Sequence, residues 1–144
     1  MNATVVLLVD DEVPFVETMT KRLSRRNLSV LTAHSGEEGL ERLLEHENVD
    51  IVILDLKMPG VDGIQTLRAI RKDHPLVEVI VLTGHGTVET GIEAMRLGAF
   101  DFLSKPCNLD QLVVKIQEAK SLKRKREEKI TLARIREISM RRSE

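Results

Sequence analysis

A chain of 144 residues with 42% apolar and 31% charged residues has the size and composition of one globular domain. Its apolar runs, such as residues 5–9 and 79–82, are far too short to span a membrane, and no basic-then-apolar signal segment opens the chain, so we expect a cytoplasmic protein. The single cysteine, Cys107, excludes an intramolecular disulfide, and only three aromatic residues, all Phe, argue against a base-stacking platform for nucleic acid.

The net charge of −1 conceals an uneven distribution. Residues 121–144 carry nine Lys and Arg against four Asp and Glu, a charge of +5, so the remaining 120 residues carry −6. The KRKR run at 123–126 is more typical of a solvated helix face than of a nucleic-acid contact. The chain therefore combines an acidic body with a basic tail.

Short apolar runs alternate with helical patterns five times along the chain. The predicted strands are Val5–Val9, Leu28–Ala33, Ile51–Leu54, Val79–Leu82 and Phe100–Leu103. Apolar residues recur at helical spacing after each strand, at Phe15, Met19 and Leu23; at Leu40, Leu43 and Leu44; at Ile64, Leu67 and Ile70; at Val88, Ile92 and Met95; and at Leu109, Leu112, Val113 and Ile116. This alternation predicts a parallel sheet with right-handed crossovers.

Local start and stop signals support these helices. Capping boxes are predicted at Ser35 with Glu38 and at Asn108 with Gln111, and helix ends at His74-Pro75 and Gly98. No Pro or Gly follows residue 106, so one long helix can run through the C-terminal segment. The apolar positions after Leu122 do not keep a clean heptad, and the pattern leaves a coiled coil undecided.

Strand composition predicts the order of the sheet. The first, third and fourth strands are continuously apolar, as in strands covered on both faces, whereas the strands at 28–33 and 100–103 carry polar residues typical of edges. The predicted fold class is therefore α/β: a flavodoxin-like (βα)5 doubly wound parallel sheet with strand order 2-1-3-4-5 and an extended C-terminal helix. We expect residues 1–120 to form the domain and residues 121–144 a basic helical tail or linker.

The residues of chemical interest come at the carboxyl ends of the predicted strands. They are Asp10-Asp11-Glu12 after the first strand, Asp55 after the third, Thr83-Gly84 after the fourth and Ser104-Lys105-Pro106 after the fifth. Open parallel sheets bind ligands at this edge, where the strand order reverses, here between the first and third strands. Any one of these residues alone is an ordinary strand end. Together they predict a site with carboxylates, a hydroxyl and an ammonium.

The chemistry of these groups favours phosphoryl transfer. Clustered carboxylates need a compensating cation, and an all-oxygen site with two or three carboxylates suits Mg²⁺. Mg²⁺ beside a Lys and a Thr can stabilise the charge of a phosphoryl group in transfer. Asp55, at the end of a buried central strand, is the best nucleophile candidate, because a carboxylate can carry an aspartyl-phosphate.

At these residues the sequence resembles the receiver domain of bacterial two-component response regulators, over about residues 3–120. The matching motifs are VDDE at 9–12, LDLKMPG at 54–60, TGHG at 83–86 and GAFDFLSKP at 98–106. The last three look closest to receivers of the nitrogen-regulation type, which precede sigma-54-activating ATPase domains. The resemblance implies a signalling switch, with residues 1–120 as the receiver and Asp55 as the acceptor of a phosphoryl group from a sensor histidine kinase.

The resemblance also implies the ligands of the metal. Asp10 and Asp11 would bind Mg²⁺ together with Asp55 and the backbone carbonyl of Lys57. The chain would catalyse only its own phosphorylation and dephosphorylation, and would turn over no external substrate.

Three further residues receive switch or phosphoryl-contact roles from the same resemblance. Thr83 would contact the phosphoryl group and shift toward it, and Lys105 would pair with the phosphoryl oxygens and precede a cis proline, Pro106. Phe102 would take the switch-aromatic position, where many relatives have Tyr. We expect phosphorylation to bias a surface of the fourth helix, fifth strand and fifth helix that controls homodimer contacts; the C-terminal helix is a second candidate dimerisation element.

Two other functions stay open at this point. An aspartate-nucleophile phosphatase would use the same residue types, but such enzymes are expected to carry a second acid two residues after the nucleophile, where this chain has Lys57. A nucleic-acid-binding module would use the basic tail, although no DNA-binding helix pair is predicted. The chain contains no GxxxxGK motif of an ATPase domain, so we expect either a stand-alone receiver or a fragment of a longer regulator.

Overall fold

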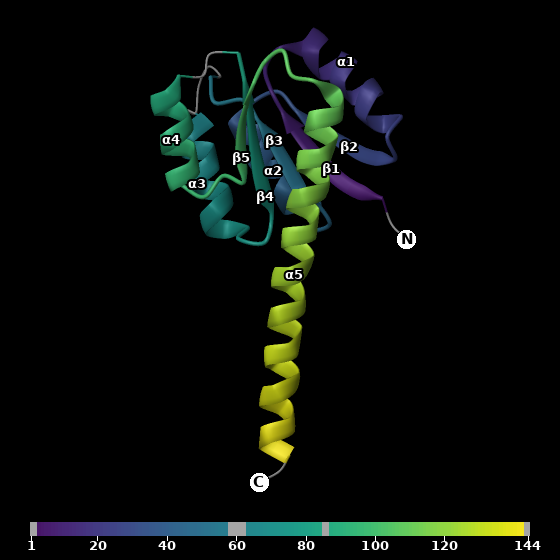
Figure 1. Cartoon of the computed structure of the whole chain (residues 1–144), viewed down its shortest axis with the longest axis vertical. Coiled ribbons are helices and arrows are strands. Elements are labelled where there is room, and N and C mark those ends of the chain that lie inside the picture. Colours follow the sequence, from purple (N-terminus) through teal and green to yellow (C-terminus); the bar gives the residue numbers. More distant parts are fainter. Residues whose placement is uncertain (1–2, 58–62, 85–86, 143–144) are drawn as a thin grey trace.

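The computed structural model describes residues 3–57, 63–84 and 87–142. Strands and helices alternate strictly along these ranges (Figure 1). The elements are β1 (Thr4–Val9), α1 (Val13–Ser24), β2 (Leu28–Ala33), α2 (Gly36–Glu45), β3 (Ile51–Leu54), α3 (Gly63–Asp73), β4 (Glu78–Thr83), α4 (Val88–Arg96), β5 (Asp101–Ser104) and α5 (Leu109–Arg142). The strands predicted from the sequence are confirmed to within one residue at each end.

All strand pairs are parallel, and the order across the sheet is β2-β1-β3-β4-β5. Every residue of β3 and β4 is buried, while β2 and β5 carry most of the partly exposed positions. The predicted fold class and strand order are therefore confirmed. In register, Val9 lies beside Leu54, so the residues that follow these two positions leave the sheet side by side.

Two apolar clusters lie on opposite faces of the sheet, because side chains alternate along each strand. Leu7 and Val9 of β1 pack toward the cluster that includes residues of α2, α3 and α4. Val6 and Leu8 pack toward the other cluster, with residues of α1 and α5. Helices thus cover both faces, as expected for a doubly wound sheet. None of the helices within the described ranges has both the length and the apolar character of a membrane span.

The predicted helix caps are mostly confirmed. The hydroxyl of Ser35 accepts a hydrogen bond from the amide of Glu38 at 3.1 Å, and the side chain of Asn108 accepts one from the amide of Gln111 at 3.2 Å. The Glu38 carboxylate accepts from the amide of the residue before the cap, at 3.3 Å, so this capping box is shifted by one residue. The stop after α4 is Gly98, whose φ of +99° is a left-handed conformation that favours glycine.

Helix α4 forms where the sequence predicts it, but its large apolar residues do not enter the core. Val88, Ile92 and Met95 are 80%, 48% and 46% exposed, whereas Ala94 is fully buried. Because β5 is an edge strand, the sheet does not continue beneath the outer side of α4. A small residue therefore makes the close contact, and the larger apolar side chains stay at the surface.

Helix α5 confirms the expected long C-terminal helix. Its 34 residues span about 51 Å at 1.5 Å per residue, and the half after the buried Ala119 projects away from the sheet (Figure 1). Exposed apolar residues recur along this half, at Ile130, Leu132, Ile135, Ile138 and Met140. They are spread around the helix, in agreement with the irregular heptad of the sequence.

Ion pairs tie α5 to the amino end of the sheet. Asp50, just before β3, pairs with Lys120 at 2.6 Å and Lys123 at 3.2 Å, and Glu78 of β4 pairs with Arg126 at 2.5 Å. Both acids are almost completely buried. We call these five residues the α5 anchor. Burial alone would raise the pKa of Asp50, but hydrogen bonds from Lys120, the Val5 amide and Lys123 outweigh it and hold that pKa below its ordinary value.

Candidate functional site

Three carboxylates meet at the carboxyl edge of the sheet. Asp10 and Asp11 follow β1 and Asp55 follows the neighbouring strand β3, and each offers a carboxylate oxygen within 4.8 Å of those of the other two. Asp10 and Asp55 are 1% and 2% exposed, and Asp11 is half-buried. The structure therefore brings together the three acids that the sequence singled out.

Backbone hydrogen bonds hold two of these acids in place. The amide of Asp55 donates to the carbonyl of Val9 at 3.0 Å, which continues the β1–β3 ladder past the last strand residue. One carboxylate oxygen of Asp55 accepts from the amide of Lys57 at 3.1 Å, and one of Asp10 accepts from the amide of Glu12 at 2.9 Å. Each carboxylate is thus fixed by its own loop and keeps a second oxygen for other partners.

Lys105 brings a positive charge to these acids from the loop after β5. Its Nζ lies 2.6 Å from Asp10 Oδ2, 3.2 Å from Glu12 Oε1 and 3.5 Å from Asp55 Oδ2, and its side chain is only 11% exposed. Its amide donates to the carbonyl of Thr83 at 2.9 Å, and the following peptide bond to Pro106 is cis, as expected. The ammonium therefore neutralises part of the acidic cluster.

Burial and the mutual attraction of Asp10 and Lys105 shift the pKa values of both groups. Burial raises the pKa of Asp10 above its ordinary range, although hydrogen bonds from Lys105 and the Glu12 amide oppose the change. Burial would lower the pKa of Lys105, but the hydrogen bond to Asp10 and the charges of Asp10 and Asp55 outweigh it and raise that pKa. Lys105 consequently remains an ammonium at neutral pH.

Thr83 and Lys57 complete the set of predicted residues on this edge. Thr83 is the last residue of β4, is 1% exposed and pairs in register with Ser104 beside Lys105. Lys57 is exposed, two residues beyond Asp55. The remaining residues of the two motifs, 58–60 and 85–86, lie outside the described residues.

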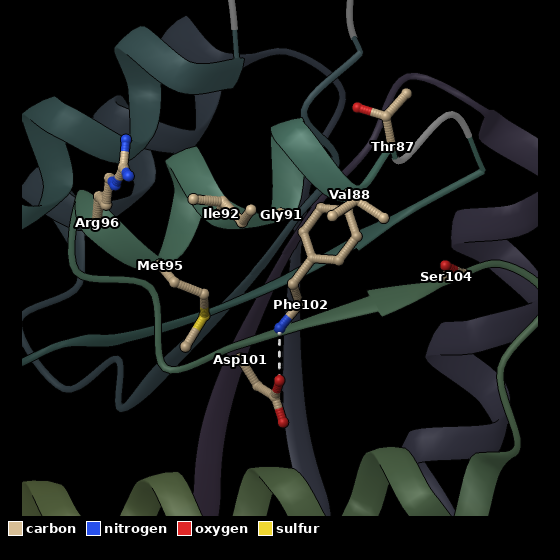
Figure 2. A pocket seen from close by; sticks show the side chains of 9 residues that line it. All are labelled: Thr87, Val88, Gly91, Ile92, Met95, Arg96, Asp101, Phe102 and Ser104. Carbon is tan, nitrogen blue, oxygen red and sulfur yellow. Dashed lines mark hydrogen bonds between the residues drawn. The ribbon is translucent and has the colours of Figure 1, made fainter.

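Phe102 lies away from the carboxylates, in a groove between α4 and β5 of about 730 Å³. Figure 2 shows its ring beneath Gly91 and beside Val88, with Ile92 and Met95 along the same groove. The contact with α4 is close, because a Cβ added at Gly91 would meet the ring at 3.3 Å. Three of its nine lining residues are the exposed apolar residues of α4, and Thr87, Arg96, Asp101 and Ser104 add polar groups.

Two residues of the site have no predicted role in the sequence. Glu12 belongs to the VDDE motif, and it provides a second carboxylate for Lys105. In the sequence Phe15 shows only the spacing of an apolar helix face, yet Lys105 Nζ lies 4.1 Å from the centroid of its ring. The helical spacing of Phe15 predicts that it faces the sheet, but no local signal indicates which cation it meets.

The donor set fits a hard divalent cation. Asp10, Asp11 and Asp55 offer only carboxylate oxygens, the two buried ones are fixed by backbone amides, and one face of the cluster is open through the half-buried Asp11. Mg²⁺ is bound in proteins by such small oxygen sets, with water completing the shell. The site can therefore hold Mg²⁺ next to a buried carboxylate and an ammonium.

Comparisons with known proteins point to a single family. A family model described as the response regulator receiver domain matches residues 6–117. The transcriptional regulatory protein GlrR of Escherichia coli K12 is 43% identical over 114 residues, which cover 79% of this chain and 26% of GlrR. The DNA-binding transcriptional regulator NtrC of the same strain is 33% identical over 119 residues, which cover 83% of this chain and 25% of NtrC.

A solved structure gives the same match at the level of the fold. The crystal structure of a response regulator receiver domain protein from Clostridium thermocellum is 38% identical and has a TM-score of 0.80, covering 84% of this chain and 97% of that chain. This chain spans about a quarter of the length of the two curated relatives. It corresponds to nearly the whole of the clostridial receiver.

Proposed function

The chain belongs to the response regulator receiver domain family, and we propose that it works as a phosphorylation-controlled switch with Asp55 as phosphoacceptor. Members of this family share a signalling fold, and the family is not an enzyme family as such. Phosphorylation and Mg²⁺ binding are general properties of its members. The match to NtrC agrees with the resemblance of the sequence to receivers of the nitrogen-regulation type. The observation that carries the proposal is the buried Asp55 carboxylate beside Asp10, Asp11 and the Lys105 ammonium.

The proposed reaction is a direct transfer to the carboxylate. An oxygen of Asp55 forms a bond to phosphorus while the bond from phosphorus to a histidine nitrogen of a sensor kinase breaks, and its electron pair returns to that nitrogen. The Asp55 carboxylate is held for attack by the Lys57 amide. Lys105, 3.5 Å from Asp55 Oδ2, is close enough to pair with the incoming phosphoryl oxygens, and Thr83 is proposed to contact them from β4.

We assign the metal ligands to Asp10, Asp11, Asp55 and the backbone carbonyl of Lys57. When bound, Mg²⁺ supplies charge neutralisation for the phosphoryl oxygens. The protein contributes the rigidity of its donors, because the Asp10 and Asp55 carboxylates are each fixed by a backbone amide. We propose that the chain catalyses only its own phosphorylation and dephosphorylation.

The switch is proposed to run from Asp55 to the α4–β5–α5 face. A phosphoryl group adds about −1.5 to −2 charge, which attracts Lys105 and the Thr83 hydroxyl. Movement of Thr83 would open space beside β5, and Phe102 would turn from the groove toward it. The apolar groove of α4 would then change shape and alter homodimer contacts. The C-terminal helix is the second candidate dimerisation element.

We propose residues 1–120 as the receiver unit and residues 121–144 as a helical extension, with the α5 anchor fixing the direction in which the helix leaves the sheet. The proposed compartment is the cytoplasm, where a sensor histidine kinase would act on the chain. This chain spans about a quarter of the length of GlrR and NtrC. By analogy with these regulators, we propose that the receiver controls an output carried by a longer protein.

Labelling with a small-molecule phosphodonor tests the function. The wild-type chain is expected to take up one phosphoryl group in the presence of Mg²⁺, and Asp55→Asn is expected to take up none. Asp73→Asn is a matched control, because Asp73 is an exposed acid at the end of α3. Label that persists in Asp55→Asn, or that appears equally without Mg²⁺, would contradict the proposal.

A further inference from the structure

Beside its carboxylate partners, the ammonium of Lys105 also faces an aromatic ring. Its Nζ lies 4.1 Å from the centroid of the Phe15 ring, within the distance at which the face of an aromatic ring attracts a cation. The Lys105 side chain is only 11% exposed, so water screens this attraction less than it would at an open surface. The contact therefore has the geometry and the burial of a cation–π interaction.

The ring itself is held firmly. Phe15 lies in the first turn of α1, directly after Pro14, whose fixed φ suits the start of a helix. It is half-buried and packs against the apolar cluster that contains Val16 and Leu8. The ring is thus anchored to the core on one side and presents its face to the ammonium of Lys105.

The other partners of Lys105 are the groups that the proposed reaction uses. Asp10 and Asp55 are the assigned metal ligands, and both attract the ammonium in the structure. A divalent cation among these carboxylates would offset their charge and repel Lys105. The attraction between the carboxylates and Lys105 therefore becomes weaker when a divalent cation is bound. The attraction between the Phe15 ring and Lys105 does not depend on the carboxylates.

We propose that Phe15 is a positioning residue for Lys105, keeping the ammonium at the site while its carboxylate partners are shared with the cation and the phosphoryl group. This inference rests on the proposed function, since it assigns Lys105 to the phosphoryl oxygens. Phe15 touches no reacting atom in this scheme and acts only through Lys105. An aromatic ring is required at this position, whereas an aliphatic side chain of similar size fills the space without the attraction.

The test compares four forms of the 144-residue chain: wild type, Phe15→Leu, Phe15→Tyr and Phe100→Leu. Phe15→Leu keeps an apolar side chain and removes the ring, and Phe15→Tyr keeps the ring. Phe100→Leu is the matched control, because Phe100 is half-buried and packs on the same apolar cluster, whereas the ring over the Lys105 ammonium is that of Phe15. The first readout is the rate constant for phosphorylation by acetyl phosphate at saturating Mg²⁺.

We expect Phe15→Leu to lower this rate constant about three- to tenfold, the size of a partly desolvated cation–π contact. Phe15→Tyr is expected to restore it, and Phe100→Leu to leave it within about twofold of wild type. The second readout needs no metal: the Lys105 side-chain protons are expected to show an upfield ring-current shift in nuclear magnetic resonance spectra of the Mg²⁺-free chain. That shift should persist in Phe15→Tyr and disappear in Phe15→Leu.

Equal rate constants for Phe15→Leu and Phe100→Leu would overturn the inference, as would a Phe15→Tyr chain as slow as Phe15→Leu. Phe15→Met replaces Phe15→Leu if the latter does not fold, with the same expectations. The two proposals fail separately. A wild-type chain that is not phosphorylated on Asp55 removes the proposed function, whereas a phosphorylated chain indifferent to Phe15 removes only the positioning role.

Discussion

Asp50 and Lys120 form an ion pair of 2.6 Å, although they lie 70 residues apart in the chain. Asp50 stands before the central strand β3, and Lys120 lies one residue after the last buried residue of α5. The other Asp50 oxygen accepts a hydrogen bond from the amide of Val5 at 2.9 Å. One buried carboxylate therefore connects the first strand, the third strand and the long helix.

Asp50→Asn is expected to destabilise the chain by about 1–3 kcal/mol, because Lys120 and Lys123 lose a buried charged acceptor. The free energy of unfolding from urea denaturation measures the effect. Asp73→Asn, an exposed acid at the end of α3, serves as control and is expected to stay within about 0.5 kcal/mol of wild type. Equal stabilities of the two variants would show that the Asp50 part of the α5 anchor contributes nothing to stability.

The same carboxylate makes part of the stability depend on pH. Hydrogen bonds from Lys120, the Val5 amide and Lys123 outweigh burial and hold the pKa of Asp50 below its ordinary 3.8. The contribution of Asp50 is therefore fully present above that ordinary value and is lost as the pH falls through the lower pKa of the folded state. The difference in urea midpoint between wild type and Asp50→Asn should be constant from about pH 7 to pH 5 and shrink below about pH 4. A difference that grows with acid would contradict this assignment.

Lys105→Met is expected to bind Mg²⁺ about tenfold more tightly than wild type, because removing a cation beside the carboxylates removes a repulsion. Calorimetric titration of the chain with Mg²⁺ measures the affinity. Lys115→Met is the matched control, since Lys115 of α5 pairs with Asp101 of β5 and not with the carboxylate cluster. Weaker or unchanged Mg²⁺ binding by Lys105→Met would place the metal site elsewhere.

Gly91→Ala is expected to move the ring of Phe102. The added Cβ would meet the ring at 3.3 Å, closer than most such contacts, so the ring must shift within the groove. The stability should rise by at most about 1 kcal/mol, the gain in helix propensity from Gly to Ala. Resonances of the Phe102 ring report the displacement, and Glu93→Ala on the exposed side of α4 should leave them in place. Unmoved ring signals in Gly91→Ala would show that the groove accommodates the methyl group without change.

The parts of this fold that the sequence predicts depend on local patterns. The runs of apolar residues define β1, β3 and β4 because strands covered on both faces exclude polar side chains. The order of the sheet then brings Asp10, Asp11 and Asp55 together, because parallel strands end at a common edge. Capping side chains such as Ser35 mark helix starts by a hydrogen bond within a few residues.

The sequence does not predict contacts between residues far apart in the chain, or which apolar side chains stay exposed at the surface. Asp50 and Lys120 are ordinary charged residues until the chain folds, and their pairing has no local signal. The spacing of Val88 and Ile92 is that of a buried helix face, but the edge position of β5 leaves both at the surface. The contact of Phe15 is equally hidden from the sequence: the apolar spacing predicts the helix that contains Phe15, but not the packing of its ring against the Lys105 ammonium.

The most direct test of the account locates the phosphoryl group itself. The chain would be treated with acetyl phosphate and Mg²⁺, digested at low temperature and analysed by tandem mass spectrometry. We expect one phosphoryl group, on the peptide that contains Asp55 and on that residue within it. A phosphoryl group on another residue, or one that remains in the Asp55→Asn chain, would contradict the assignment of Asp55 as the phosphoacceptor.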